Sequence, residues 1–204
     1  MRYTAEHKEE THRKIVQTAA RAFKRHGLQG VGIADLMKKA GLTHGGFYAH
    51  FADRDTLVAE ATAAGYEEAA ERLLAHLADA PSDDTLRALI DRYLSPLHRA
   101  HPESGCPLPA LAADMSRQPA PVRRAFTDSF RRYSARLAAL LPGRYKSDRG
   151  SDRGDTALAV LSGLAGAVML ARAVSDPDLS DRILAASRQF YLDALHHTQK
   201  PGKA

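Results

Sequence analysis

The pattern of apolar and polar positions along the chain predicts a mainly helical protein. Near the N-terminus, Ile15, Ala19 and Phe23 recur at helical spacing between charged positions, which favours an amphipathic helix from about residue 6 to 26. Gly27 follows directly. Glycine often ends a helix because it adopts left-handed backbone angles without strain. This first helix is expected to support the shorter segments that come next.

Two short helices joined by a tight turn are predicted after the first helix. The first of the pair covers about residues 33–40, and Gly41 ends it as a second left-handed stop. The second covers residues 44–51, where Phe47 and Phe51 are four positions apart and share a buried face. The arrangement is typical of a helix-turn-helix, which places its second helix in the major groove of DNA.

The outward face of the second short helix carries small and polar residues. Burial of the two phenylalanines leaves His44, Gly45, Tyr48 and Ala49 facing outward. A glycine inside a helix costs about 1 kcal/mol relative to alanine. The pair Gly45 and Gly46 is therefore expected where the backbone approaches another surface closely, and that surface could be DNA.

Basic residues flank this short helix. Asp53 can cap a further helix that begins at about Arg54. The charge of Arg54 is poorly placed for the dipole of a helix start. It is well placed to bind a phosphate, which the backbone amides of the helix start also attract. Lys38 and Lys39 point outward from the first helix of the pair and are further candidates for phosphate contact. The alternative for both lysines is an ordinary solvated face.

Residues 40–57 carry the pattern A-G-L-T-x-G-x-F-Y-x-H-F-x-x-R-D-x-L. This pattern resembles the signature of the tetracycline-repressor (TetR-type) family of transcriptional regulators, and the similarity covers about residues 8–60. One departure is visible at Gly32, where such proteins usually have Thr or Ser at the start of the helix. Glycine is an acceptable N-cap, so this departure weakens local stability more than the resemblance.

The resemblance implies an all-α fold in two domains. Residues 1–55 would form a helix-turn-helix DNA-binding domain, a helix from about residue 53 would link the domains, and residues 56–204 would form a helical ligand-binding and dimerisation domain. For Tyr48 and His50, packing or capping is the alternative to DNA contact. The resemblance assigns phosphate contacts to Thr43, Tyr48, His50 and Arg54, and base-facing positions to His44, Gly45 and Ala49.

The second half of the chain continues as amphipathic helices. A helix over residues 83–101 is expected to kink or end early at Pro96. A polar stretch at residues 143–155 has no apolar periodicity and predicts a loop. The remaining helices are expected at about residues 108–117, 122–141, 154–175 and 178–197.

Residues 158–174 are almost entirely apolar. The stretch is slightly short for a membrane span of about 20 residues and includes Arg172, so a buried or interface helix is expected and no membrane partner. In the family resembled, the last two helices pack against their twins in a homodimer, and a helix that is apolar all round needs burial on more than one side. The expected dimer residues are Leu161, Leu164, Ala165, Val168, Ile183, Phe190, Tyr191 and Leu195.

A set of aromatic and apolar residues is a candidate effector pocket. In the family resembled, a small molecule usually binds between the helices of the second domain and changes the spacing of the DNA-reading heads. An apolar, aromatic wall indicates a hydrophobic or aromatic compound, and the alternative is that these side chains only fill the core. The candidates are Tyr93, Leu97, Leu108, Leu111, Met115, Phe126, Phe130, Tyr133 and Met169.

Cys106 is the single cysteine of the chain, which excludes an intrachain disulfide and indicates a reducing cytoplasm. Pro107 follows, and proline is favoured in the first turn of a helix. A thiol near a helix N-terminus is more acidic and more reactive, and His98 and His101 are near in sequence. The hypothesis is that Cys106 senses oxidants or electrophiles by covalent modification. The alternative is a buried, inert thiol.

Charge and motif content narrow the function classes. The formal net charge of +5 favours a polyanionic partner. The sequence MRYTAEHKEETHRK at the start lacks an apolar signal region, which predicts a cytoplasmic protein. No recognisable metal-ligand spacing is present, and neither a P-loop, a G-x-S-x-G motif nor an H-E-x-x-H motif occurs. We therefore expect no metal, no cofactor and no enzymatic activity.

These observations predict a homodimeric one-component transcriptional regulator, a repressor rather than an activator. It would bind a palindromic operator in double-stranded DNA and be released by a small hydrophobic, aromatic or electrophilic effector. One alternative is a small-molecule-binding or enzymatic helical domain whose helix-turn-helix is merely structural. Another is a DNA-binding protein without sequence preference.

Overall fold

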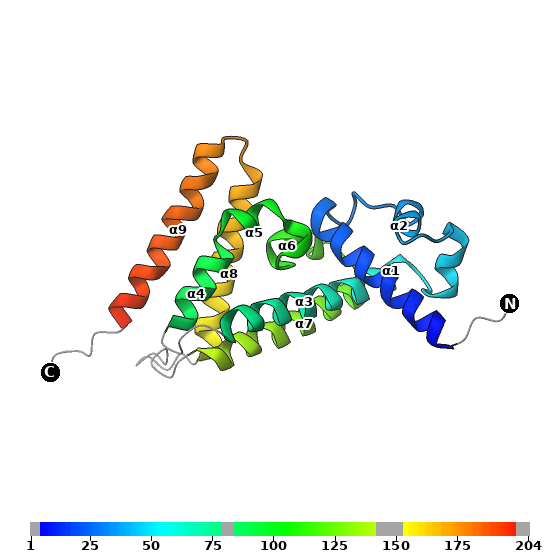
Figure 1. Cartoon of the computed structure of the whole chain (residues 1–204), viewed down its shortest axis with the longest axis horizontal. Helices are drawn as coiled ribbons and strands as arrows, with labels where there is room; N and C mark the ends of the chain where they lie inside the picture. The colour runs from blue at the N-terminus through cyan, green and yellow to red at the C-terminus, as the bar shows by residue number, and fades with distance from the viewer. Residues whose placement is uncertain (1–4, 79–83, 142–152, 199–204) are drawn as a thin grey trace. The chain divides into compact units, whose positions relative to one another are not determined.

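The computed structural model describes residues 5–78, 84–141 and 153–198, and every regular element in these ranges is helical (Figure 1). The predicted all-α fold is confirmed. Most of the loop predicted at residues 143–155 lies outside the described residues. In chain order the elements are α1 (Ala5–His26), α2 (Ile33–Lys39), the 3-10 helix η1 (His44–Ala49), α3 (Arg54–Ala78), α4 (Thr85–Tyr93), α5 (Pro96–Ala100), the 3-10 helix η3 (Pro102–Ser104), α6 (Leu108–Met115), α7 (Ala120–Leu140), α8 (Arg153–Ala173) and α9 (Pro177–Thr198).

Two segments show how local chemistry sets the element bounds. The second helix of the helix-turn-helix is the 3-10 helix η1, with Gly46 N–H donating to the Thr43 carbonyl at 3.1 Å. Two adjacent glycines disfavour a longer α-helix here. Further along, α4 ends before Pro96, as predicted, and Ser95 caps α5 by accepting a hydrogen bond from His98 N–H at 3.1 Å.

The chain forms two compact units. The first unit contains the described residues up to Ala69 together with Pro102–Phe130, and the second contains the described residues of 70–101 and those from Arg131 onward. The helix-turn-helix therefore shares its unit with η3, α6 and the first half of α7. The domain boundary expected at residue 55 is a functional division and remains a prediction.

The core of the first unit joins the helix-turn-helix to α6 and α7. The rings of Phe47 and Phe51 stack with their centroids 5.3 Å apart, and both side chains are buried with Ile15 and Met37. Burying a large apolar side chain contributes about 1.5–3 kcal/mol relative to leaving it exposed. The residues that α6 and α7 add to this cluster are Leu111, Met115 and Val122, with Phe126 partly buried against them.

A part-buried hydrogen bond fixes the loop between α1 and α2 to α6. Leu28 N–H donates to the Asp114 carboxylate at 2.9 Å, and Leu28 has no exposed surface. Gly27, just before it, has the left-handed φ of 71°, as predicted, and a Cβ there would lie 3.2 Å from the same carboxylate oxygen. Glycine therefore permits both the turn and the close approach of α6.

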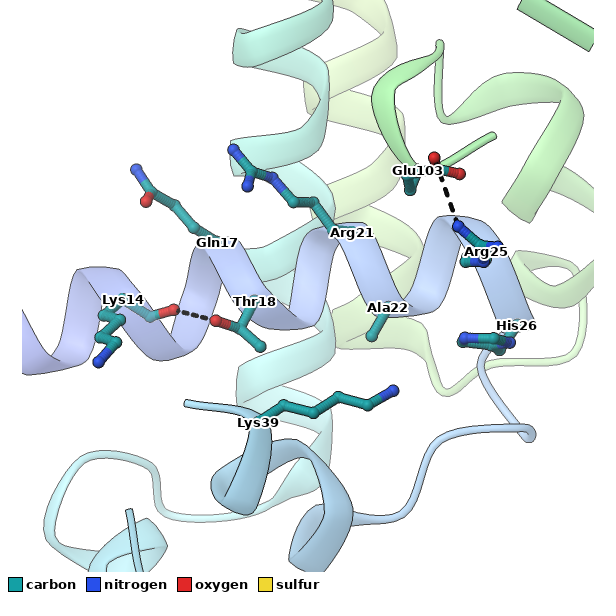
Figure 2. Close-up of a pocket in the computed structure, with 9 residues that line it drawn as sticks. All are labelled: Lys14, Gln17, Thr18, Arg21, Ala22, Arg25, His26, Lys39 and Glu103. Atoms are coloured by element: carbon teal, nitrogen blue, oxygen red, sulfur yellow. Dashed lines mark hydrogen bonds and ion pairs between the residues drawn. The ribbon is translucent and has the colours of Figure 1, made fainter. Parts of the chain in front are cut away.

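The segment that contains η3 is held on α1 by basic side chains. The buried Lys24 ammonium donates to the Gly105 carbonyl at 3.2 Å and to Glu68 at 3.3 Å. Arg25 pairs with Glu103 of η3 at 3.5 Å (Figure 2). These contacts attach the stretch that includes Cys106 to the first helix of the helix-turn-helix.

The helices α8 and α9 pack closely in the second unit. A Cβ at Gly163 of α8 would clash with the Tyr191 hydroxyl, so a larger residue there would force the Tyr191 ring to move. By length and composition α8 is long and apolar enough to cross a membrane. One such helix is weak evidence, because core helices have the same composition. Leu161 and Leu164 are fully buried, while 39% of the apolar window as a whole is buried, so α8 is buried on one side within the single chain.

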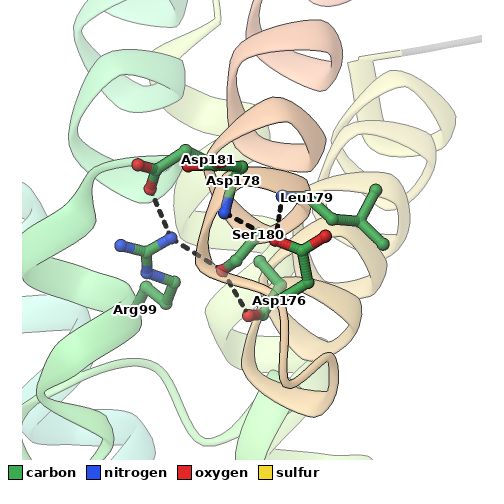
Figure 3. Close-up of polar contacts among 7 residues, drawn as sticks. Arg99, Asp176, Asp178, Leu179, Ser180 and Asp181 are labelled. Atoms are coloured by element: carbon green, nitrogen blue, oxygen red, sulfur yellow. Dashed lines mark hydrogen bonds and ion pairs between the residues drawn. The ribbon is translucent and has the colours of Figure 1, made fainter.

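A polar cluster holds α5 against the corner between α8 and α9 (Figure 3). Arg99 donates to Asp181 at 2.6 Å and to the Ser180 hydroxyl at 2.7 Å. Ser180 in turn donates to the Ala171 carbonyl at 2.6 Å. Arg172 of α8 donates to two carbonyl oxygens of α5, at 2.6 and 3.0 Å. The C-terminal end of α5 is therefore fixed to both later helices.

We expect Asp114→Ala to lower the free energy of unfolding by about 1–3 kcal/mol, because the buried Leu28 N–H loses its acceptor. Urea unfolding followed by circular dichroism measures this loss. Arg117→Ala is the matched control, since it removes only the guanidinium that pairs with Asp114 at 3.0 Å and is 69% exposed. Such exposed pairs contribute about 0–1 kcal/mol. Equal losses in the two variants would contradict the role given to Asp114.

Candidate nucleic-acid interface

The element η1 presents a continuous exposed face. Thr43, His44, Gly45 and Ala49 are exposed, and Tyr48 is 66% exposed. The opposite side of η1 is held in the core by the two stacked phenylalanines. The residues predicted to face outward are therefore at the surface of the first unit, on a rigidly seated element.

Aromatic neighbours position the Tyr48 side chain. Its ring lies edge-on to Phe47, with centroids 5.2 Å apart and an interplanar angle of 86°, and its centroid is 6.4 Å from the His44 ring. The phenol is thus exposed and braced by its neighbours. A tyrosine hydroxyl both donates and accepts hydrogen bonds, which suits a phosphate oxygen or a base edge.

Packing within the chain does not explain the glycine pair. A Cβ at Gly45 would meet nothing within 4 Å, and one at Gly46 would make only ordinary contacts of 3.7 Å with Thr43 and 3.8 Å with Met37. Thr43 occupies the N-cap position of η1, but its hydroxyl makes no capping hydrogen bond. A glycine that its own chain does not require fits close approach by an external surface.

The start of α3 differs in part from the expected picture. Asp53 caps this helix as predicted, accepting from Thr56 N–H at 2.7 Å, and the hydrogen bonds from Thr56 lower the pKa of Asp53. Arg54 is half-buried, donates to the Leu28 carbonyl and lies over the Phe23 ring at 5.8 Å. Arg54 therefore holds the start of α3 against the loop between α1 and α2. Contact between its other N–H groups and a phosphate remains a prediction.

His50 belongs to a histidine cluster that sequence spacing did not reveal. The His12 ring stacks on Phe51 with centroids 4.5 Å apart, and its Nε2 lies 2.6 Å from the Glu60 carboxylate. The His50 ring is 5.9 Å from that of His12. Burial lowers the pKa of His50, and the charges of His12 and Lys8 lower it further. At neutral pH the lowered pKa favours a neutral imidazole, and the phosphate contact expected of His50 remains a prediction.

Lys38 lies exposed in the last turn of α2, beside Lys39. Cations at this end of a helix interact favourably with its dipole, which is a structural reason for both lysines. The exposed position also suits phosphate contact, so the prediction for Lys38 stands untested.

Cys106 lies directly before Pro107, the N-cap residue of α6, as the sequence indicated. The thiol is buried, at 6% exposure. Burial raises the pKa of the nearby Tyr66 phenol, and the charge of Cys106 raises it further. Pro107 packs close to Gly65, where an added Cβ would lie 3.4 Å from the Pro107 Cγ. His98 and His101, which are near Cys106 in sequence, belong to the second unit.

The predicted effector-pocket residues divide between the two units. Leu111 and Met115 complete the helix-turn-helix core, as the alternative of core filling predicts. In the second unit, the gap beside Tyr133 has no room for a water molecule. The set thus remains a prediction. Leu108, Leu111, Met115, Tyr93 and Tyr133 are buried, Phe126 and Phe130 are half-buried, and Leu97 and Met169 are 57% and 43% exposed.

The predicted dimer residues also differ in exposure. Leu161, Leu164 and Val168 have no exposed surface in the single chain, and their place in a dimer contact remains a prediction. Ala165, Ile183 and Tyr191 are half-buried, Phe190 is 67% exposed, and the side chain of Leu195 lies outside the described residues. The large apolar side chains exposed on α8 and α9 are Leu158, Met169, Leu170, Leu179 and Phe190.

Within the part of the chain that the structure describes, no group of three or more His, Cys, Asp or Glu side chains is arranged to hold a metal ion. His98, one of the histidines at helical spacing, has its Nδ1 2.7 Å from the Tyr93 carbonyl oxygen. The absence of metal and cofactor remains an expectation.

Two family models match the chain. Residues 15–61 match the model described as bacterial regulatory proteins, tetR family, and residues 83–187 match the model described as tetracyclin repressor-like, C-terminal domain. No curated protein matches the chain significantly. The first match covers the helix-turn-helix, and the second alone covers more than half of the sequence.

Solved structures share the fold over almost their whole length. A TetR-family transcriptional regulator from Cytophaga hutchinsonii is 18% identical with a TM-score of 0.74, covering 94% of this chain and 98% of its own. A TetR transcriptional regulator from Chloroflexus aurantiacus is 25% identical, with a TM-score of 0.70 and coverages of 91% and 96%. The reduced form of NemR from E. coli is 19% identical, with a TM-score of 0.71 and coverages of 95% and 100%.

The lowered pKa of His50 predicts a pH-dependent stability. As pH falls below the ordinary value of 6.5, the unfolded chain takes up this proton before the folded chain does. The stabilisation present above that pH is then lost as pH falls through the folded-state pKa. Urea unfolding between about pH 8 and pH 5 should therefore show a smaller loss of stability in His50→Gln than in the wild-type protein. If the stability of the wild-type protein and of His50→Gln changed equally with pH, the role given to His50 would be contradicted.

Proposed function

Because the chain belongs to the TetR family of bacterial regulatory proteins, we propose that it is a cytoplasmic, homodimeric repressor released from a palindromic operator by an effector. The observation that carries this proposal is the exposed face of η1, where Tyr48 and His44 surround glycines that the chain's own packing does not require. A helix-turn-helix that was merely structural would have no reason to combine these features.

Base readout is assigned to a small set of groups on η1. His44 offers an imidazole to base edges, Ala49 offers a methyl group to thymine, and Gly45 allows the backbone to come close. Phosphate contacts from Thr43 and Tyr48 set the register on the duplex. Such contacts release counterions, so affinity should fall steeply with salt.

The dimer contact is assigned to the exposed apolar side chains of α8 and α9 rather than to the buried ones. Phe190 is 67% exposed and Leu170 is 54% exposed, so both are available for contact with a second copy. Exposed apolar patches commonly mark interaction surfaces. A two-fold dimer would present two copies of η1 to half-sites separated by about 10 base pairs or a multiple of it.

The effector is either a hydrophobic or aromatic compound or an electrophile that modifies Cys106. For an α,β-unsaturated carbonyl, the Cys106 sulfur forms a bond to the β-carbon, the thiol proton leaves to solvent, and a solvent proton completes the α-carbon. Because the site leaves Cys106 only 6% exposed, an added group does not fit the closed loop. Overfilling a packed site costs about 1–3 kcal/mol.

Modification at Cys106 has a direct structural route to the DNA-binding unit. The residue before it, Gly105, accepts from the buried Lys24 of α1, and α6 after it enters the helix-turn-helix core. An effector releases DNA only if it favours the conformation that does not bind DNA.

Tyr48→Ala is expected to abolish specific DNA binding without unfolding the protein. The side chain is 66% exposed, so its loss should change the free energy of unfolding by less than about 0.5 kcal/mol. Fluorescence anisotropy on duplexes from upstream of the protein's own coding region, with excess unrelated duplex, measures binding. Tyr48→Phe is the control that keeps the ring and removes only the hydroxyl. Full specific affinity in folded Tyr48→Ala would refute the proposed reading face.

Cys106→Ser separates the two kinds of effector. N-ethylmaleimide should add one group to the wild-type protein, seen by mass spectrometry, and weaken its DNA binding, because the adduct does not fit the buried site. The Ser variant should bind DNA as well as wild type and resist the reagent. If the reagent released both proteins equally, Cys106 would have no role in sensing.

A further inference from the structure

A groove beside α1 is lined by polar side chains, among which cations outnumber carboxylates (Figure 2). Its volume is about 420 Å³, and residues of α1, the end of α2 and η3 form its walls. This groove lies wholly within the first unit and shares no residue with the exposed face of η1. The charged lining residues are Lys14, Arg21, Arg25, Lys39 and Glu103.

The lysines and the arginines of the groove differ in their partners. Arg21 pairs with Glu68 at 3.6 Å, and Arg25 pairs with Glu103 at 3.5 Å. Neither Lys14 nor Lys39 pairs with a carboxylate among the residues that the structure describes, and both are exposed. The two ammonium groups therefore leave the groove with an excess of positive charge that an external anion can match.

The groove adjoins the turn that leads into η1. A Cβ at Gly41, in that turn, would lie 3.7 Å from the Lys14 ammonium nitrogen. Figure 2 shows the Lys39 side chain extended alongside α1, past Thr18 and toward His26. The cations thus follow the length of α1 instead of converging on one point. A linear array suits a strand of phosphates better than it suits a single small anion.

We propose that this groove binds the phosphate backbone of operator DNA outside the base pairs read by η1. The inference rests on the proposed DNA-binding function and adds a second contact region to it. Duplex DNA carries about one charge per 1.7 Å of axis, so a strand that passes the turn at Gly41 brings several phosphates within reach of the groove. Lys14 and Lys39 are assigned as its phosphate ligands.

The test compares Lys14→Gln/Lys39→Gln with the control Arg123→Gln/Arg124→Gln. The control removes the same charge from exposed positions of α7 in the same unit. Each protein is titrated with the shortest duplex that the wild type binds specifically and with that duplex extended by about 10 base pairs at each end. Dissociation constants are measured over a range of salt, and circular dichroism verifies folding.

On the extended duplex, the lysine variant should bind on the order of tenfold more weakly per lost contact near 0.1 M salt, with a slope of log K against log salt reduced by about 0.9 per contact. On the shortest duplex it should match the wild type, and the arginine control should match it on both. Wild-type affinity of the lysine variant for the extended duplex, or an equal loss on both duplexes, would overturn the proposal.

A further arm distinguishes a free phosphate ligand from DNA. Calorimetric titration with tripolyphosphate tests whether the groove binds a small anion instead. Saturable binding by the wild type that is lost in the lysine variant, together with equal affinity of the two proteins for the extended duplex, would make the groove a small-anion site and overturn the DNA assignment. Absence of any specific duplex for the wild type would instead contradict the proposed function itself.

Discussion

The apolar core that the helix-turn-helix shares with α6 is the contact on which the rest of the structure depends. An isolated helix shorter than about 12 residues is only marginally stable in water, so η1 keeps its shape through tertiary packing. Phe47 and Phe51 provide that packing on one side, and Leu111 and Met115 of α6 complete the same cluster. The order of the exposed face of η1 therefore depends on how α6 packs in this cluster.

Under the proposed function, this shared core is the route by which a change near Cys106 would reach the DNA-binding surface. Asp114 of α6 holds the loop between α1 and α2 at Leu28, and the stretch before α6 is attached to α1 through Lys24. Cys106 lies between these two attachments. A change in this stretch must therefore alter either the packing of α1 or the position of α6, and both belong to the unit that carries η1. A ligand that favours the altered packing would shift the population away from DNA binding.

Features that depend on neighbouring residues could be predicted from the sequence, whereas contacts between distant segments could not. Helical periodicity, the glycines at positions 27 and 41, and the cap at Asp53 each depend on neighbouring residues. By contrast, the contact of Arg54 with Leu28 and the His12–Glu60 pair join residues on different elements. Periodicity also shows only that Leu161 and Leu164 need burial. It does not distinguish burial within one chain from burial in a dimer, and the structure places both side chains inside the chain.

The most direct test of the account is selection of bound duplexes from a random DNA library by the purified protein at physiological salt. The account predicts enrichment of one inverted repeat whose half-sites are separated by about 10 base pairs or a multiple of it, because a two-fold dimer presents two copies of η1. Tyr48→Ala, selected in parallel, should enrich nothing. Recovery of an unenriched library by the folded wild-type protein, or enrichment of the same sequence by Tyr48→Ala, would contradict it.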